Sequence, residues 1–196
     1  MSSPDHFRNI WGSKDSAFHI VPLSAEDRLW YLVTAGRVKR YHTAPTLASD
    51  TVGCHSLGVV LLCEILSEEP ARAALLLAAA AHDLPELVTG DIPAPVKRAV
   101  GELTDALGAL EETILTRIGI IHPELTLAEI RTLKLADIAD GQLYCCYERS
   151  LGNLNISSVY YRYVEYLETL MPFKNQKERE VLSSIQSIWS RYHYGH

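Results

Sequence analysis

The sequence predicts an all-α protein built as a single domain. Apolar residues recur at helical spacing in most segments, and no segment shows a strand-like alternation of comparable strength. The chain has 196 residues, of which 47% are hydrophobic and 21% are charged, a balance typical of a globular domain with a substantial core. These observations together favour a helical bundle.

The expected helices follow one another along the chain between loops rich in turn-forming residues. The first helix begins after Ser24, a candidate N-cap that is followed three residues later by Asp27. Residues 36–50 and 89–95 contain too many helix breakers to be helical and are expected to be loops. The helices are expected over residues 24–35, 51–66, 70–82, 96–119, 125–150, 157–170 and 177–192.

Composition excludes several classes of partner and sets the expected organisation. The formal net charge of −6 argues against binding to a nucleic-acid polymer, and the longest apolar run is shorter than the roughly 20 residues that span a bilayer. A polar N-terminus and four cysteines without CxxC spacing favour a reducing cytoplasm. The expected divisions are an N-terminal extension, the main domain and a C-terminal helix that packs on the same domain, over residues 1–23, 24–170 and 171–196.

The most informative feature is the doublet His82-Asp83, which ends the apolar run from Ala73 to Ala81. A charged group buried by a core helix costs several kcal/mol unless it is paired or bound to a metal. A divalent cation accepts both an imidazole and a carboxylate. The doublet therefore favours a metal site at the end of this helix.

Two more polar side chains fall on apolar helical faces. His55 lies four residues before Val59 on the inward face of its helix, and Asp137 falls among aliphatic residues of a later helix. Asp140 is expected to be rotated away from that face, as a surface acid. A lone helical His is more often a hydrogen-bonded core residue, and a lone inward Asp is more often a cap or half of a salt bridge. Periodicity alone leaves these interpretations open beside the metal site.

Two longer motifs make the pattern more specific. They are VKRYHT at residues 38–43 and HDLPELVTGDIPAPVK at residues 82–97. With the order His…His-Asp…Asp on successive helices, they resemble the HD-domain metal-dependent phosphohydrolases. The resemblance is to the branch that contains bacterial 5'-deoxynucleotidases and the phage triphosphohydrolases that remove dATP. It covers roughly residues 37–152 and implies an HD-domain helical bundle.

The resemblance also implies roles for individual residues. Glu86 is expected to position or activate water, and Asp91 to act as the acid/base near the scissile phosphate. Without the resemblance, Glu86 would be interpreted as a solvated helix-end acid and Asp91 as a turn former beside Gly90. One divalent ion (Zn, Co, Mn or Fe) is expected to be held by His55, His82, Asp83 and Asp137.

Five residues are expected to contact the substrate. Arg40 and Lys97 supply positive charge for phosphate, although either could simply be a solubilising surface residue. Tyr41 stands where relatives carry an aromatic residue that packs on the deoxyribose, and a flat ring there would crowd a 2'-hydroxyl. His42 is expected to donate to the phosphate chain or to stabilise its loop, and Pro93 to line the base pocket.

Cys54 is a departure from the family pattern. The branch commonly carries Glu immediately before the first ligand His, in a Glu-His-Ser context, whereas this chain has Cys54-His55-Ser56. A carboxylate that would orient the imidazole is missing at this position, which puts the affinity and identity of the metal in question.

The resemblance implies hydrolysis of the bond between the 5'-oxygen and the α-phosphorus of a deoxynucleotide. The basic segment 38–43 favours a dNTP, with dATP as the first candidate and Mg²⁺ accompanying the triphosphate. A 5'-deoxynucleotidase acting on dNMPs is the alternative, and a catalytically inactive HD module that binds a nucleotide is an alternative of another class. A homo-oligomer is expected, both from the resemblance and from apolar positions at residues 159–170.

Overall fold

The computed structural model describes residues 23–193, with the exception of residues 100 and 122. This part of the chain is helical and contains no strand, only an isolated antiparallel bridge between Lys39 and Thr51. The expected all-α fold is therefore confirmed. The expected extension over residues 1–23 lies, apart from Leu23, outside the described residues.

Most of the expected helices are present, with shifted ends. None of the described helices is both long enough and apolar enough to cross a bilayer. The helices are α2 Ala25–Ala35, α3 Val52–Leu66, α4 Ala73–Ala81, α5 Glu86–Thr89, α6 Ala94–Ala99, α7 Gly101–Arg117, α8 Leu127–Ser150, α9 Ser157–Glu168 and α10 Gln176–His193, with a 3₁₀ turn at Leu154–Ile156.

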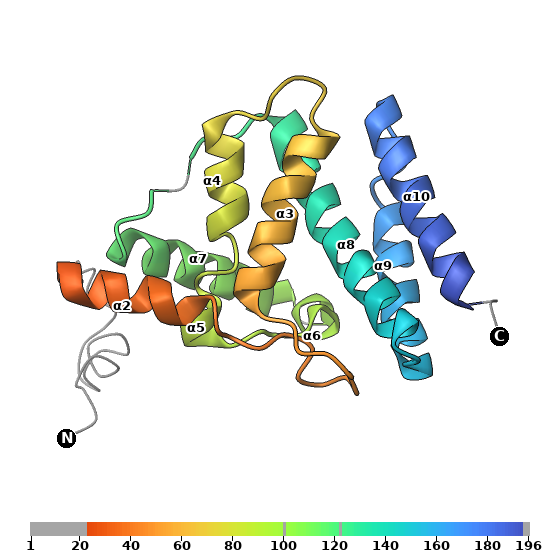
Figure 1. Ribbon diagram of the computed structural model, residues 1–196. Coiled ribbons are helices and arrows are strands. Elements are labelled where there is room, and N and C mark those ends of the chain that lie inside the picture. The colour runs from red at the N-terminus through yellow and green to blue at the C-terminus, as the bar shows by residue number, and fades with distance from the viewer. Residues whose placement is uncertain (1–22, 100, 122, 194–196) are drawn as a thin grey trace.

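The main core forms where α3, α4, α9 and α10 pack around α8 (Figure 1). Leu66, Leu75 and Leu135 are almost fully buried at its centre. On the far side of α8, the Tyr160 ring stacks on Trp189 with ring centroids 3.7 Å apart. α8 is therefore covered from two sides, which makes its buried face wider than a single apolar stripe.

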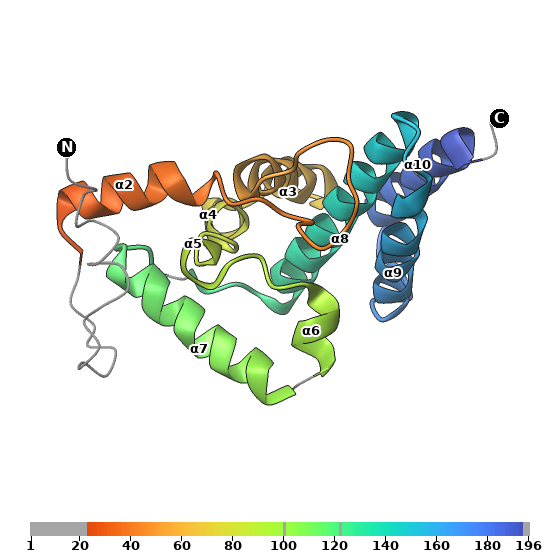
Figure 2. The ribbon, with the colours of Figure 1, turned by 90° about the horizontal axis from the view of Figure 1, so that it is seen from below.

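A second, smaller core joins α2 and α7 to the end of α4 (Figure 2). Tyr31, Ala81 and Ile114 are buried there. The Tyr31 hydroxyl donates a hydrogen bond of 2.9 Å to the backbone oxygen of Leu84. Helix α2 thereby fixes the turn that follows the doublet His82-Asp83.

Three local expectations differ from the structure. α4 begins at Ala73 rather than at residue 70, because Arg72 has extended backbone and makes a bidentate contact with Glu129 of α8. The single helix expected over residues 96–119 is two helices, α6 and α7. The turn after the doublet contains a short helix, α5, that the sequence pattern did not indicate.

The loop between α2 and α3 is anchored by Glu148, a fully buried acid of α8. Its carboxylate accepts hydrogen bonds from the backbone N–H groups of Leu47 (2.8 Å) and Ala48 (2.6 Å) and from the Asn153 side chain (2.6 Å). Burial raises the pKa of Glu148, but these three donors outweigh it and lower the pKa below its ordinary value. The loop that carries Arg40 is thus tied to α8.

We expect Glu148→Gln to lower the free energy of unfolding by about 2–4 kcal/mol, because the new amide brings a donor towards three buried donors. Urea denaturation at neutral pH measures this change. Glu165→Gln on the exposed side of α9 is the matched control and is expected to change stability by less than about 0.5 kcal/mol. Equal midpoints for the two variants would contradict the anchoring role.

Candidate metal and phosphohydrolase site

The four residues of the His…His-Asp…Asp pattern meet at one point between α3, the end of α4, and α8. His55 Nε2 lies 3.2 Å from His82 Nε2, 3.3 Å from Asp83 Oδ2 and 3.2 Å from Asp137 Oδ1. His82 Nε2 lies 3.4 Å from Asp83 Oδ2. Ligand atoms about 2.1 Å from one divalent ion lie roughly 3 Å apart. The ligand atoms of His55, His82 and Asp137 all lie within 4.8 Å of one another, so the spacing of these three suits a shared ion. Asp83 lies beside the two histidines and is not part of this tighter group.

The other ring nitrogen of each histidine is already engaged. His55 Nδ1 lies 2.6 Å from Asp140 Oδ2, and His82 Nδ1 lies 2.7 Å from the backbone oxygen of Ala79. In the neutral rings, both acceptors favour the tautomer with the proton on Nδ1, which leaves the Nε2 lone pairs available to a cation. Two imidazole nitrogens and two carboxylates are a donor set that fits a divalent transition ion.

Asp140 is not the surface acid that helical periodicity predicted. Its side chain is 17% exposed, whereas that of Asp137 is 48% exposed. The expectation was wrong because α8 is covered on two sides, so Asp140 lies against α3 rather than in water. Gly58 of α3 makes the room: a Cβ at this position would lie 1.9 Å from Asp140 Oδ1.

Metal binding competes with a proton at His55, which is almost fully buried. Burial lowers the pKa of this imidazole, but hydrogen bonds to Asp137 and Asp140 outweigh it and raise the pKa to about 9 in the metal-free protein. A cation that coordinates Nε2 must displace this proton.

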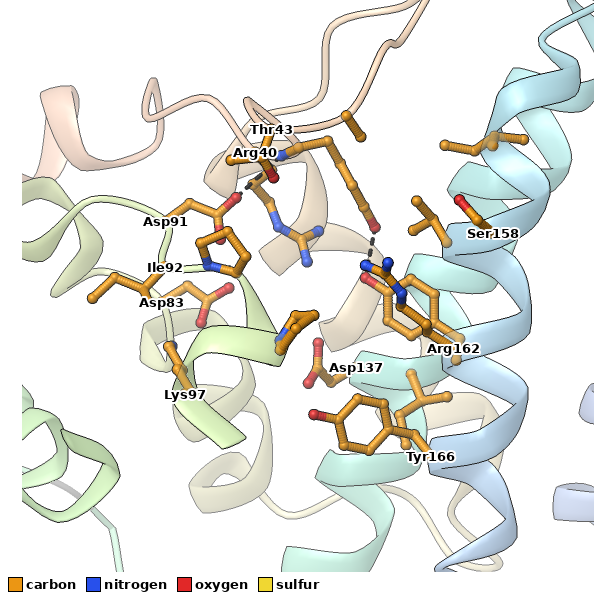
Figure 3. Close-up of a pocket in the computed structure, with 18 of the residues that line it drawn as sticks. Arg40, Thr43, Asp83, Asp91, Ile92, Lys97, Asp137, Ser158, Arg162 and Tyr166 are labelled. Carbon is orange, nitrogen blue, oxygen red and sulfur yellow. Dashed lines mark hydrogen bonds between the residues drawn. The ribbon is translucent and has the colours of Figure 1, made fainter. Parts of the chain in front are cut away.

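A cavity of about 570 Å³ opens beside the four residues, a volume typical of small-molecule sites (Figure 3). The loop after α2, the segment from Asp83 to Lys97, α8 and α9 form its walls. The expected site residues that line it are Arg40, Tyr41, Asp83, Glu86, Asp91, Pro93, Lys97 and Asp137.

Glu86 is buried against this cavity, with 5% of its surface exposed. One of its carboxylate oxygens, Oε2, has no hydrogen-bond partner in the described part of the chain. Burial, followed by the negative charges of Asp83 and Asp91, raises the pKa of Glu86 to about 9. In the metal-free protein, Glu86 therefore carries a proton at neutral pH.

Asp91 is held by the loop between α2 and α3. Its Oδ2 accepts a hydrogen bond of 3.1 Å from the backbone N–H of Tyr41, which has the left-handed φ of 57° (Figure 3). The Tyr41 ring stacks on Tyr144, and its hydroxyl lies 2.8 Å from that of Tyr163. Strained backbone of this kind persists only where its surroundings hold it, as these contacts do.

Arg40 and His42, two of the expected substrate residues, are less directly available to a substrate than the others. Arg40 lines the cavity but its Nη1 is 3.1 Å from Asp50 Oδ2, so the guanidinium already has a buried partner. His42 is not among the residues that line the cavity; its side chain is 49% exposed, with Nδ1 3.8 Å from Asp91 Oδ2. Its position fits stabilisation of the loop better than contact with phosphate.

Several residues that line the cavity from α8 and α9 are not indicated by any sequence motif. They recur at helical spacing. The same spacing is typical of an ordinary amphipathic helix, so it does not by itself indicate a site. Figure 3 shows Arg162 and Tyr166 extending from α9 towards Asp137. The residues are Lys134, Ser158, Val159, Arg162, Tyr163 and Tyr166.

Comparison with known proteins identifies the family. A family model for YfbR-like 5'-deoxynucleotidases matches residues 29–182. The chain belongs to this family and is an HD-domain phosphohydrolase. Its general activity is therefore hydrolysis of a phosphate bond in deoxynucleotides. A search of curated proteins gave no significant match.

Several solved structures share the fold, and two of them are HD phosphohydrolases. The DatZ HD phosphohydrolase of cyanophage S-2L, bound to dA and one catalytic Zn²⁺, is 17% identical with a TM-score of 0.65, over 87% of this chain and 99% of that one. The HD-domain phosphohydrolase lin2634 of Listeria innocua is 20% identical with a TM-score of 0.65, over 86% and 90%. The PH0347 protein of Pyrococcus horikoshii is 18% identical with a TM-score of 0.58, over 84% and 98%.

The raised pKa of Glu86 makes the stability of the metal-free protein depend on pH. Between pH 4.5 and about 9, the folded state holds a proton that the unfolded chain releases, so the free energy of unfolding falls as pH rises. We expect Glu86→Gln to remove this component, which is on the order of 4 kcal/mol between pH 5 and pH 8.5. Urea denaturation in the presence of a chelator measures it.

Glu112→Gln, an exposed position of α7, is the control and is expected to keep the pH dependence of the wild-type protein. Parallel curves for wild type and Glu86→Gln would show that Glu86 is ionised at neutral pH.

Proposed function

We propose that this phosphohydrolase acts on deoxynucleoside triphosphates, with dATP as the first candidate, and releases deoxynucleoside and triphosphate. The observation that carries the proposal is the charge of the cavity wall. Lys97, Lys134 and Arg162 line the cavity from three different helices. Within the described part of the chain, their side chains have no acidic partner of their own. Three such cations suit a triphosphate better than a monophosphate.

The residues around the cavity divide the chemistry between them. His55, His82, Asp83 and Asp137 would hold one divalent ion (Zn, Co, Mn or Fe), which activates water and polarises a phosphoryl oxygen. Glu86, whose Oε2 is buried against the cavity without a hydrogen-bond partner in the described part of the chain, orients the attacking water. It accepts the proton of this water once it has lost its own proton. Asp91 is the proposed acid/base beside the scissile bond: it takes up a proton from water and passes it to the 5'-oxygen as the bond to the α-phosphorus breaks.

The sugar and base are proposed to lie against the loop residues. Tyr144 already covers one face of the Tyr41 ring, so a deoxyribose would meet the remaining face or the edge that carries the hydroxyl. A 2'-hydroxyl would be crowded there, which gives selectivity for deoxynucleotides. Pro93 offers an apolar contact for the base and reads its shape rather than its hydrogen bonds. A Mg²⁺ ion would accompany the triphosphate.

Hydrolysis of dNMPs is the second candidate, and the family match to 5'-deoxynucleotidases favours it. The bond broken is the same, between the 5'-oxygen and the α-phosphorus. The difference lies in whether the cavity holds or excludes the outer phosphates. We also infer that the protein works in the cytoplasm and binds neither membranes nor nucleic-acid polymers.

We further infer a homo-oligomer, although not through residues 159–170. Val159, Val164 and Leu167 pack on the main core. Exposed apolar side chains on α2 and α3 offer a surface to a second copy of the chain. They include Leu29, Leu32, Val33, Leu57, Leu61 and Ile65.

A substrate panel tests the proposed activity directly. The purified protein is incubated with each dNMP, each dNTP and the matching ribonucleotides, with Mn²⁺, Co²⁺ or Zn²⁺ or with a chelator, and the products are separated by ion-exchange chromatography. We expect dATP to give deoxyadenosine and triphosphate in a metal-dependent reaction. Phosphate release from dNMPs alone would replace the triphosphate proposal with the nucleotidase. Saturable nucleotide binding without turnover under any metal would indicate an inactive module.

Variants of Asp91 and Asp137 test the division of roles. Asp137→Ala removes a metal ligand, so metal retention and turnover are expected to be lost together. Asp91→Ala is expected to keep the metal while kcat falls by about 10²-fold or more, the scale of a lost acid/base. Metal content by atomic emission and steady-state kinetics measure both effects. Equal loss of metal in the two variants would overturn the assignment of Asp91 as acid/base.

A further inference from the structure

We propose that Asp140 is a positioning residue of the metal centre, and that it fixes the imidazole of His55 in the tautomer and orientation that present Nε2 to the cation. The inference rests on the proposed metal-dependent function. It concerns a residue outside both the sequence motifs and the four expected ligands.

The geometry of the contact is the first argument. Asp140 Oδ2 lies 2.6 Å from His55 Nδ1, a short distance typical of a charge-assisted hydrogen bond. The His55 side chain is fully buried, and that of Asp140 is 17% exposed. Little water is available there to replace the carboxylate as acceptor. Without Asp140, the tautomer with a proton on Nε2 becomes competitive, and that tautomer cannot bind a metal.

The backbone of α3 is shaped to admit this carboxylate, which is the second argument. At Gly58, one turn after His55, a Cβ would lie 1.9 Å from Asp140 Oδ1 and 2.9 Å from its Cγ. Any side chain at residue 58 would push the carboxylate away from the imidazole. A glycine in the middle of a helix is less stable there than Ala, and here the space that it leaves is filled by the Asp140 carboxylate.

Arg40 supplies the third argument, because it balances the charge of Asp140. Its Nη1 lies 3.8 Å from Asp140 Oδ2 and 3.1 Å from Asp50 Oδ2. The carboxylate of Asp140 therefore lies between a guanidinium and an imidazole. Arg40 also lines the cavity, so the same side chain links the support of the metal centre to the substrate wall.

This arrangement accounts for Cys54, the departure from the family pattern. Cys54 is exposed, and the carboxylate expected beside His55 on α3 is absent. Asp140 brings a carboxylate to the same imidazole from α8, 85 positions away in the sequence. The metal centre is therefore supported from the opposite helix.

The test compares Asp140→Ala and Asp140→Asn with the wild-type protein, without substrate. Co²⁺ affinity is measured by competition with a chromophoric chelator and the geometry of bound Co²⁺ by its visible absorption spectrum. The His55 tautomer is measured by ¹⁵N NMR of the metal-free protein above pH 9, where the imidazole is neutral. We expect Asp140→Ala to bind Co²⁺ 10–100-fold more weakly, with an altered spectrum and a mixture of tautomers. Asp140→Asn keeps a hydrogen-bond acceptor and is expected to rescue the tautomer and part of the affinity.

Two further variants separate positioning from general stability. Gly58→Ala leaves Asp140 in place but displaces its carboxylate, and is expected to weaken Co²⁺ binding in the same direction. Glu178→Gln disrupts the contacts of another buried acid with Arg131, and is expected to lower stability while Co²⁺ affinity stays within about twofold. Wild-type Co²⁺ affinity and an unchanged His55 tautomer in Asp140→Ala would overturn the proposal. Because no nucleotide is present, failure of the proposed substrate would not affect this result.

Discussion

The structure depends on one buried imidazole that makes two different contacts. His55 Nε2 faces His82, Asp83 and Asp137, and its Nδ1 contacts Asp140. A buried ring with polar groups at both nitrogens is tolerable only where both are satisfied. This requirement fixes how closely α3 and α8 approach, and Gly58 meets it on the α3 side. The apolar core around these helices supplies the rigidity that keeps the polar contacts aligned.

The second constraint is the loop between α2 and α3, which has little core of its own. Its shape comes from long-range hydrogen bonds, chiefly those of Glu148 to the backbone of Leu47 and Ala48. The same loop presents the backbone N–H of Tyr41 to Asp91. The proposed acid/base is therefore positioned by a segment that a buried carboxylate of α8 holds in place. Helix α8 therefore carries both Glu148, which supports the loop, and the expected metal ligand Asp137.

The helices and the four-residue metal pattern could be predicted because both depend on residues close together in the sequence. Periodicity shows which face of a helix is apolar, and the doublet His82-Asp83 ends an apolar run. Periodicity does not show what packs on each side of a helix, and the prediction for Asp140 was wrong for this reason. The contacts of Asp140 with His55 and of Glu148 with Leu47 join residues 85 and 101 positions apart. Arg162 was missed for a related reason: its role depends on where α9 docks.

The balance of charge in the cavity links the metal to the substrate. Asp83, Glu86, Asp91 and Asp137 lie on its walls together with the cations Lys97, Lys134 and Arg162. Without a cation at the four-residue site, these acids repel an anionic substrate, and Glu86 relieves part of the repulsion by holding a proton. A divalent ion held by the four residues would neutralise the acidic end and leave the cations free for phosphates. Its positive charge would also oppose the repulsion that keeps a proton on Glu86, so one binding event would prepare both the substrate site and the base.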